Sequence, residues 1–108
     1  MGNIYDPTDG VGDYEEFGTR DWNDGHLILD LFNRTLADAA DEHDALIADI
    51  HAHFLGHGFA VDDPSHPHHD PDDPTSWYIQ RSEANDRGAS EIRRLFWQRV
   101  EEMFPAAC

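Results

Sequence analysis

A short apolar run between residues 46 and 50 constrains the fold of this chain most, because it ends abruptly among polar side chains. The run reads Leu46-Ile47-Ala48-Asp49-Ile50, and His51, His53 and His57 follow it. Buried parallel strands are near-continuous apolar runs, and open α/β sheets bind ligands where their strands end. The run therefore predicts an α/β fold with a parallel strand over 46–50 and a site at its carboxyl end.

The charge of the chain excludes several classes of partner. Its 108 residues include 23 acidic and 7 basic side chains, which gives a formal net charge of −16. A surface this acidic repels phosphate backbones and anionic bilayers, so we expect neither nucleic acid nor a membrane as a partner. A hydrophobic content of 39% still suffices for one folded domain over residues 1–108.

Cysteine usage and the first residues bear on the compartment. Cys108 is the single cysteine, so the sequence predicts neither an intramolecular disulfide nor a Cys-x-x-Cys metal site. Met1-Gly2-Asn3 has neither the basic nor the apolar region of a secretory signal, and no apolar run approaches about 18 residues. These features predict a cytoplasmic location.

Two amphipathic helices are predicted, each burying one apolar stripe. The first runs from about 26 to 43 after the capping residues Asn23-Asp24-Gly25, and the second from about 87 to 103 after Asn85 or Asp86. The first stripe consists of Ile28, Leu31, Phe32, Thr35, Leu36, Ala39 and Ala40, and the second of Ile92, Leu95, Phe96, Val100 and Met103. Gly88, in the first turn of the second helix, predicts a close approach of another backbone.

The remaining segments are predicted to be strand exits and loops. Residues 3–10 have the pattern of a strand leaving a sheet into an Asp-Pro and Asp-Gly turn, and Gly10 to Gly25 of a loop that packs its aromatic rings on the body. Prolines at 64, 67, 71 and 74 exclude a helix or central strand from 59–75, which we expect to be a flexible loop. Residues 76–80 form a short strand or an ordered loop.

Such a set of elements makes an incomplete parallel sheet. Two helices and one full strand cannot cover both faces of a parallel sheet, so the strand at 46–50 needs neighbours. We expect a homo-oligomer or a missing N-terminal half to complete the sheet, and 1–108 to be a truncated domain.

Four pieces of the sequence resemble, in order, the C-terminal half of an SGNH (GDSL-like) hydrolase. The pieces are Asn3-Ile4-Tyr5-Asp6-Pro7-Thr8-Asp9-Gly10, the helix with Leu31-Phe32-Asn33, the strand exit Ala48-Asp49-Ile50-His51 with Phe54, and Asn85-Asp86-Arg87-Gly88-Ala89. The resemblance implies an esterase or lipase with a flavodoxin-like α/β/α fold, a Ser-Asp-His triad and no required cofactor. It assigns Asn85 and Gly88 to the oxyanion or structural positions of the family.

The triad of that family is missing from the matching positions. The chain has no Gly-Asp-Ser, and Ser65, Ser76, Ser82 and Ser90 do not follow an apolar strand. Where the family has Asp-x-x-His-Pro-Asn, this chain has Gln80, Glu83 and Ala84 in place of Asp, His and Pro. Triad chemistry needs both a nucleophile and an imidazole base. We therefore expect the chain to be inactive alone, with His51 or His57 as the candidate base of a completed enzyme.

The histidines allow a second interpretation, a His-rich metal-binding module. Asp49, His51, His53 and His57 are spaced as Asp-x-His-x-His-x3-His, and the first part resembles the metal motif of amidohydrolases. In an extended segment His51 and His53 would project to one side, as zinc binding requires. The competing interpretation is that these are loop histidines bonded to backbone. A second group, His66, His68 and His69 with Asp70 and Asp72, is expected to lie in a solvated loop.

A third interpretation of the chain is a non-catalytic subunit that oligomerises.

Overall fold

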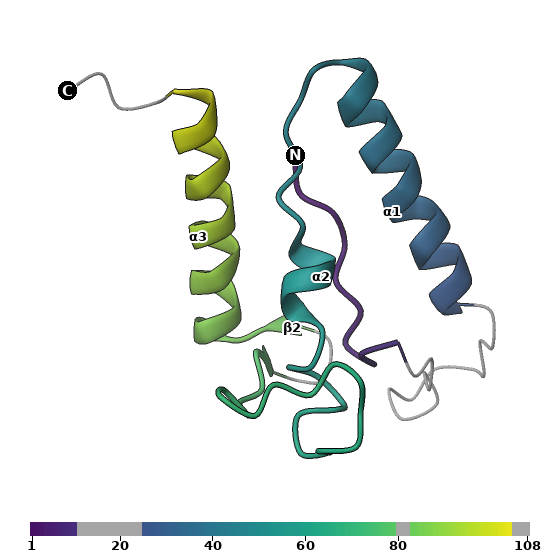
Figure 1. The fold of residues 1–108 in the computed structure, drawn as a ribbon, viewed down its shortest axis with the longest axis vertical. Coiled ribbons are helices and arrows are strands. Elements are labelled where there is room, and N and C mark those ends of the chain that lie inside the picture. Colours follow the sequence, from purple (N-terminus) through teal and green to yellow (C-terminus); the bar gives the residue numbers. More distant parts are fainter. Residues whose placement is uncertain (11–24, 80–82, 105–108) are drawn as a thin grey trace.

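Two long helices flank a central layer made of the N-terminal segment and a short helix. The computed structural model describes residues 1–10, 25–79 and 83–104. The elements, in chain order, are α1 (Gly25–Glu42), α2 (Ile50–Phe54), β1 (Tyr78–Ile79), β2 (Glu83–Ala84) and α3 (Asp86–Met103). Figure 1 shows α1 and α3 on the two sides of α2 and the N-terminal segment. The expected aromatic loop from Gly10 to Gly25 lies almost wholly outside the described residues.

The strands are shorter than the sequence suggested. β1 and β2 form a two-stranded antiparallel sheet, with Tyr78 opposite Ala84. Parallel pairing is limited, within the described ranges, to one bridge between Gly2 and Ala48. In it the Asn3 N–H donates to the Ala48 carbonyl at 3.3 Å, and the Ala48 N–H donates to the Met1 carbonyl at 2.8 Å. The fold is thus mixed α and β, with one parallel bridge between a segment that precedes α1 and a segment that follows it.

The predicted strand over 46–50 is wrong in extent, because Asp49 starts a helix. Its side chain accepts a hydrogen bond from the Ala52 N–H at 3.1 Å and so caps α2, which begins at Ile50. Aspartate is among the strongest helix N-cap residues. Residues 51–54 are therefore helical and not an extended strand exit.

Both long helices lie where the sequence predicted them. Asn85 caps α3, since its Oδ1 accepts the Gly88 N–H at 2.8 Å. A Cβ at Gly88 would collide with the carbonyl oxygen of Trp77, which confirms the expected close approach of another backbone.

The expectation that both apolar stripes are buried is wrong for most of their length. On α1, Ala40 is 2% exposed, whereas Leu31 and Phe32 are 59% and 53% exposed. On α3, Ile92 and Leu95 pack against the core, but Met103 is 57% exposed. The exposed stripe residues are Ile28, Leu31, Phe32, Thr35, Phe96, Val100 and Met103. The reason is physical, because the described part of the chain contains no sheet broad enough to cover two helices.

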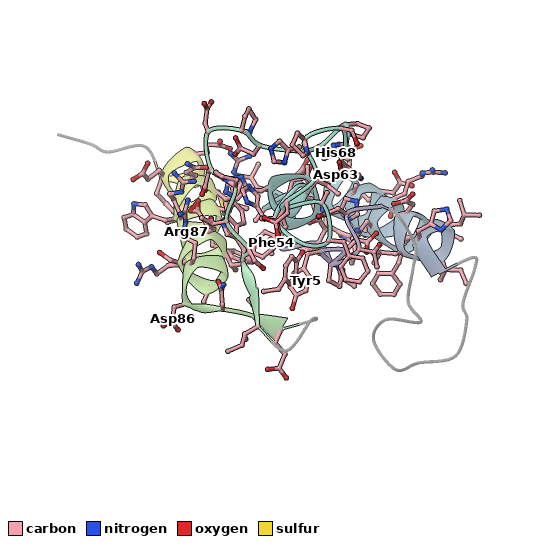
Figure 2. The ribbon with its side chains drawn as sticks, turned by 90° about the horizontal axis from the view of Figure 1, so that it is seen from below. Tyr5, Phe54, Asp63, His68, Asp86 and Arg87 are labelled. Carbon is pink, nitrogen blue, oxygen red and sulfur yellow. The ribbon has the colours of Figure 1, made fainter. Side chains whose placement is uncertain are left out.

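The core is small and aromatic. Ile50, Phe54, Trp77 and Tyr78 form it, with Tyr5 packed against it. Phe54 is 0% exposed, and its ring stacks on Tyr5 at a centroid distance of 5.3 Å and meets Trp77 edge-on at 5.1 Å. Figure 2 shows Tyr5 and Phe54 in the middle of the molecule, between the sides that carry α1 and α3. Aromatic pairs of this geometry add to the free energy gained by burial.

Residues 59–75 form consecutive turns without a helix or strand, as the prolines predicted. None of the helices in the described ranges is long and apolar enough to cross a membrane.

Replacing Gly88 by alanine tests the close packing of α3 on Trp77. Alanine is the better helix former by about 1 kcal/mol, so propensity alone predicts stabilisation. The collision with the Trp77 carbonyl reverses this sign, and we expect Gly88→Ala to lower the free energy of unfolding by about 1–3 kcal/mol. Urea denaturation measures it, with Ser90→Ala in the same helix as the control. A more stable Gly88→Ala variant would contradict the packing.

The buried phenol of Tyr78 makes the stability of the fold depend on pH in the alkaline range. Burial raises the pKa of its phenol, and the nearby carboxylates of Asp9 and Asp6 raise it further. Because the pKa is higher in the folded state, the contribution of Tyr78 to stability is full below the unfolded pKa of about 10 and is lost above it. Its buried hydroxyl has no hydrogen-bond partner in the described structure, so Tyr78→Phe should change stability at pH 7 by less than about 1 kcal/mol.

The pH dependence of unfolding measures this effect. We expect the wild type to lose stability relative to Tyr78→Phe between about pH 10 and 11, where an unfolded tyrosine ionises. Parallel curves for the two proteins would show that the phenol ionises without cost in the folded state.

Candidate functional site

Two buried aspartates shape the turn where the N-terminal segment ends. The Oδ1 of Asp6 accepts the Thr8 N–H at 2.9 Å and the Thr8 hydroxyl at 2.7 Å, and its Oδ2 accepts the Gly10 N–H at 3.1 Å. These bonds close the turn that the Asp-Pro and Asp-Gly dipeptides predicted. The turn brings the side chain of Asp9 under the segment that follows α2.

Asp9 joins the two segments through backbone donors. One carboxylate oxygen accepts the Gly56 N–H at 3.1 Å, and the other accepts the N–H groups of Gly58 at 2.9 Å and Ala60 at 2.7 Å. The side chain is fully enclosed, since Asp9 is 1% exposed. Burial raises the pKa of Asp9, while the three N–H donors act to lower it. The sequence reasoning did not identify this anchor, although a turn aspartate and two glycines six and eight residues after the apolar run were the available signal.

The four residues proposed as zinc ligands are not brought together. His51 and His53 lie on α2, where residues two apart do not face each other, so the expected projection to one side is wrong. His51 places Nδ1 at 3.0 Å from the Ile4 carbonyl oxygen and Nε2 at 3.9 Å from Asp30. His53 faces Glu91 at 3.5 Å, and Asp49 accepts a bond from Asn3 at 2.8 Å. Each of these side chains has a different partner.

His57 is set apart from the other histidines by its burial. It is 3% exposed, and its ring lies parallel to Trp77, with centroids 3.6 Å apart and 3° between the planes. Its Nδ1 is 2.9 Å from the Thr75 carbonyl oxygen, and its Nε2 is 3.6 Å from an oxygen of Asp70. The ring is therefore held in one orientation, with Nε2 directed at the loop.

A group of three side chains near His57 could hold a metal ion. His57, Asp70 and Asp73 each offer one ligand atom, and these atoms lie within 4.8 Å of one another. Within the described residues no other combination of three or more such side chains meets this spacing. The sequence reasoning placed Asp70 in a solvated loop and did not consider Asp73, because residues 57, 70 and 73 form no local motif. Only the folding of the loop brings them together.

The Asp73 carboxylate is held by two neighbours. It accepts a bond from the Thr75 hydroxyl at 2.6 Å and pairs with the Arg87 guanidinium at 2.8 Å. These contacts hold the pKa of Asp73 below its ordinary value, and the bond from the Thr75 hydroxyl has the largest effect. Figure 2 shows Arg87 on the α3 side toward the loop, whereas Asp86 points to the other side. Arg87 also covers the Trp77 ring at 5.3 Å from its centroid.

A second charged group lies where α2 packs on α3. Glu91 is 6% exposed and pairs with Arg94 at 2.7 Å and Arg87 at 3.6 Å, in addition to His53. A buried carboxylate with two guanidinium partners and an imidazole is satisfied structurally, so we assign this group to the packing of α2 on α3.

The residues assigned by resemblance meet at the start of α3. Asn85 uses Oδ1 for the Gly88 N–H and donates from Nδ2 to the Ser76 carbonyl at 2.8 Å. Both of its polar atoms are thus engaged within this chain. Glu83, which stands where the family has histidine, is exposed in β2, and Gln80 and Ser82 lie outside the described residues.

No family model matches this chain, and neither a curated protein nor a solved structure matches it. Function is accordingly argued from the residues and from the geometry described above.

Replacing Asp9 by asparagine tests the anchor. Asparagine keeps the shape but turns an NH2 group toward backbone N–H donors, so at least one buried donor loses its acceptor. We expect Asp9→Asn to lower the free energy of unfolding by about 1–3 kcal/mol, measured by urea denaturation at pH 7. Asp62→Asn, on the exposed loop surface, removes the same charge as the control. Equal stability of the two variants would contradict the anchoring role.

Proposed function

We propose that this chain is the C-terminal part of an SGNH (GDSL-like) ester-hydrolase domain with a flavodoxin-like sheet, inactive by itself. The observation that carries the proposal is the parallel pairing of Gly2 with Ala48 on either side of α1. Parallel strands need a crossover connection, which is usually a helix. The described chain has one such parallel bridge on either side of a helix, as expected for the strand-helix-strand units from which flavodoxin-like sheets are built.

The contact between α1 and the first segment supports this unit. Asn33, in the helical piece that resembles the family, accepts the Ile4 N–H with Oδ1 and donates from Nδ2 to the Ile4 carbonyl, both at 2.8 Å. This pair of bonds fixes α1 beside the N-terminal segment.

Exposed apolar surface on the long helices supports an incomplete domain. Leu27 and Leu31 on α1, Trp97 on α3 and Phe104 just after α3 are 57%, 59%, 61% and 71% exposed. Large exposed apolar patches are uncommon on self-sufficient soluble domains. Further sheet strands, from the same or another chain, would cover these sides.

The polar groups also gather at one end of the molecule. Figure 1 shows the end of the N-terminal segment, the loop after α2 and the start of α3 at the same end. Open α/β sheets bind substrates outside the carboxyl ends of their strands, which is where this end would lie. Asn85 and Gly88 lie at the start of α3 at this end, and the resemblance assigns both to oxyanion or structural positions.

The nucleophile would come from a segment with Gly-Asp-Ser, because the described serines are engaged elsewhere. Ser65 bonds Asp63 at 2.6 Å, Ser76 bonds the Tyr78 backbone N–H at 3.2 Å, and Ser90 contacts Arg93 at 3.5 Å. A catalytic base needs one ring nitrogen held and the other free to take a proton. His57 and His51 both have Nδ1 at a backbone carbonyl, and we propose His57 as the base because it lies at the polar end.

Metal binding is the second candidate function, and the grouping of His57 with Asp70 and Asp73 favours it. The hydrolase chemistry of the family needs no metal ion, and the two proposals compete for one atom, Nε2 of His57. Zinc at Asp49, His51 and His53 has no such support, since their side chains point to different partners.

Sequencing the reading frame upstream of Met1 tests the hydrolase proposal first. We expect an apolar strand followed by Gly-Asp-Ser within roughly 150 residues, one domain length. The joined protein should hydrolyse p-nitrophenyl acetate and react with a fluorophosphonate probe at that serine, while the 108-residue chain does neither. Changing the serine to alanine should abolish both signals.

The histidine variants then separate the base from its neighbours. In the joined protein His57→Ala should lower kcat by about 100-fold or more, and His53→Ala, a control on the α3 side, should leave it within about twofold. Hydrolysis by the 108-residue chain alone, or an unrelated upstream sequence, would overturn the proposal.

A further inference from the structure

We infer that His57, Asp70 and Asp73 bind one zinc-class divalent cation, and that this ion fastens the loop 58–76 against Trp77. The inference rests on the metal-binding candidate function, and its test needs no measurement of ester hydrolysis. It adds the ligand set, the class of ion and a structural role for the site.

His57 has the environment of a pre-oriented metal ligand. Stacking on Trp77 at 3.6 Å fixes the ring plane, and Nδ1 lies 2.9 Å from the Thr75 carbonyl oxygen, which can only accept a hydrogen bond. Nδ1 therefore carries a hydrogen, and Nε2 lies on the side of Asp70, where a ring without a second hydrogen offers its lone pair. Metal-bound histidines almost always donate their second N–H to a carbonyl or carboxylate in this way.

The spacing suits a shared ion better than a direct bond. Nε2 of His57 and Oδ2 of Asp70 are 3.6 Å apart, which is longer than a hydrogen bond. Two ligands at zinc distances of 2.0–2.2 Å in tetrahedral geometry are separated by about 3.4 Å. The third ligand atom, on Asp73, is within 4.8 Å of both, a distance that small side-chain rotations can shorten.

Both carboxylates are held by groups around them. Asp70 accepts the Asp72 N–H at 3.0 Å, and Asp73 is held by Arg87 and the Thr75 hydroxyl. Arg87 offsets one of the two negative charges. A divalent cation would balance the other, and it would relieve the repulsion between the two aspartates.

The ligand types select the ion. One imidazole with two carboxylates suits zinc and related transition metals, whereas magnesium and calcium prefer sites made of oxygen alone. Three protein ligands would leave a fourth position for water.

The location of the ligands sets the consequence of binding. His57 follows α2, while Asp70 and Asp73 lie 13 and 16 residues further along the chain, so one ion closes most of the loop onto the core. Binding to the folded state alone also raises its stability by mass action.

Isothermal titration with zinc chloride at pH 7 is the experiment. We expect one ion per chain, and at least a tenfold weaker binding in both Asp70→Asn and Asp73→Asn, which alter partly exposed ligands and spare the core. Asp72→Asn, with the same loss of charge on the same loop, should bind as the wild type does. Magnesium chloride should give no comparable binding.

Hydrogen–deuterium exchange tests the fastening of the loop. Zinc should slow exchange of the amides in 58–76 in the wild type and in Asp72→Asn, but not in Asp70→Asn. Absence of zinc binding overturns the inference, and so does binding lost only when His66, His68 and His69 are changed together to glutamine. Zinc binding without slower loop exchange overturns the structural role. Neither result bears on hydrolysis, which is measured separately with a chelator present.

Discussion

The structure depends on a buried carboxylate that joins two segments far apart in the sequence. Asp9 accepts three backbone N–H groups from residues 56–60, and it lies in a turn closed by Asp6. Without this acceptor, three donors beneath a loop would lie buried and unpaired, which is costly in a protein interior. The anchor places the loop after α2 beside the end of the N-terminal segment. The burial of His57 follows from that placement, because the same loop leads from α2 to Trp77.

Around this anchor the protein buries a small aromatic core and leaves much apolar surface exposed. Trp77 lies at the centre of the polar end, since His57 stacks on it, Arg87 covers it and Phe54 meets its edge. The exposed apolar side chains of α1 and α3 have no comparable packing partner among the described residues. A chain with a net charge of −16 that still exposes such stripes is consistent with a domain that is completed by further strands.

The two proposals use the same buried histidine for different purposes. As a base, His57 needs its Nε2 free to receive a proton, and as a metal ligand it needs the same lone pair for the ion. The geometry that fixes the ring, a stack on one face and a carbonyl at Nδ1, serves both roles. The joined enzyme would therefore lose its base when metal is bound, unless His51 acts in its place.

Local patterns in the sequence were sufficient for several elements. Helix periodicity and the capping signals Asn23-Asp24-Gly25 and Asn85 placed α1 and α3 within one or two residues, because those signals act over neighbouring turns. Prolines were sufficient to exclude a helix or strand from 59–75, and Gly88 indicated a close backbone contact. The resemblance to SGNH hydrolases, which rests on short pieces of sequence, stays a prediction.

Tertiary structure decided the rest, because those features depend on residues distant in the chain. Asp49 could end a strand or cap a helix. Asn3, from the distant N-terminal segment, donates to Asp49 and accepts the His51 N–H at the start of α2, where residues 50–54 are helical and His51 is separated from His53. Whether an apolar stripe is buried depends on what packs against it, and periodicity cannot supply the covering layer. The group of His57, Asp70 and Asp73 exists because the turns between them fold back onto Trp77, a long-range event that no local motif encodes.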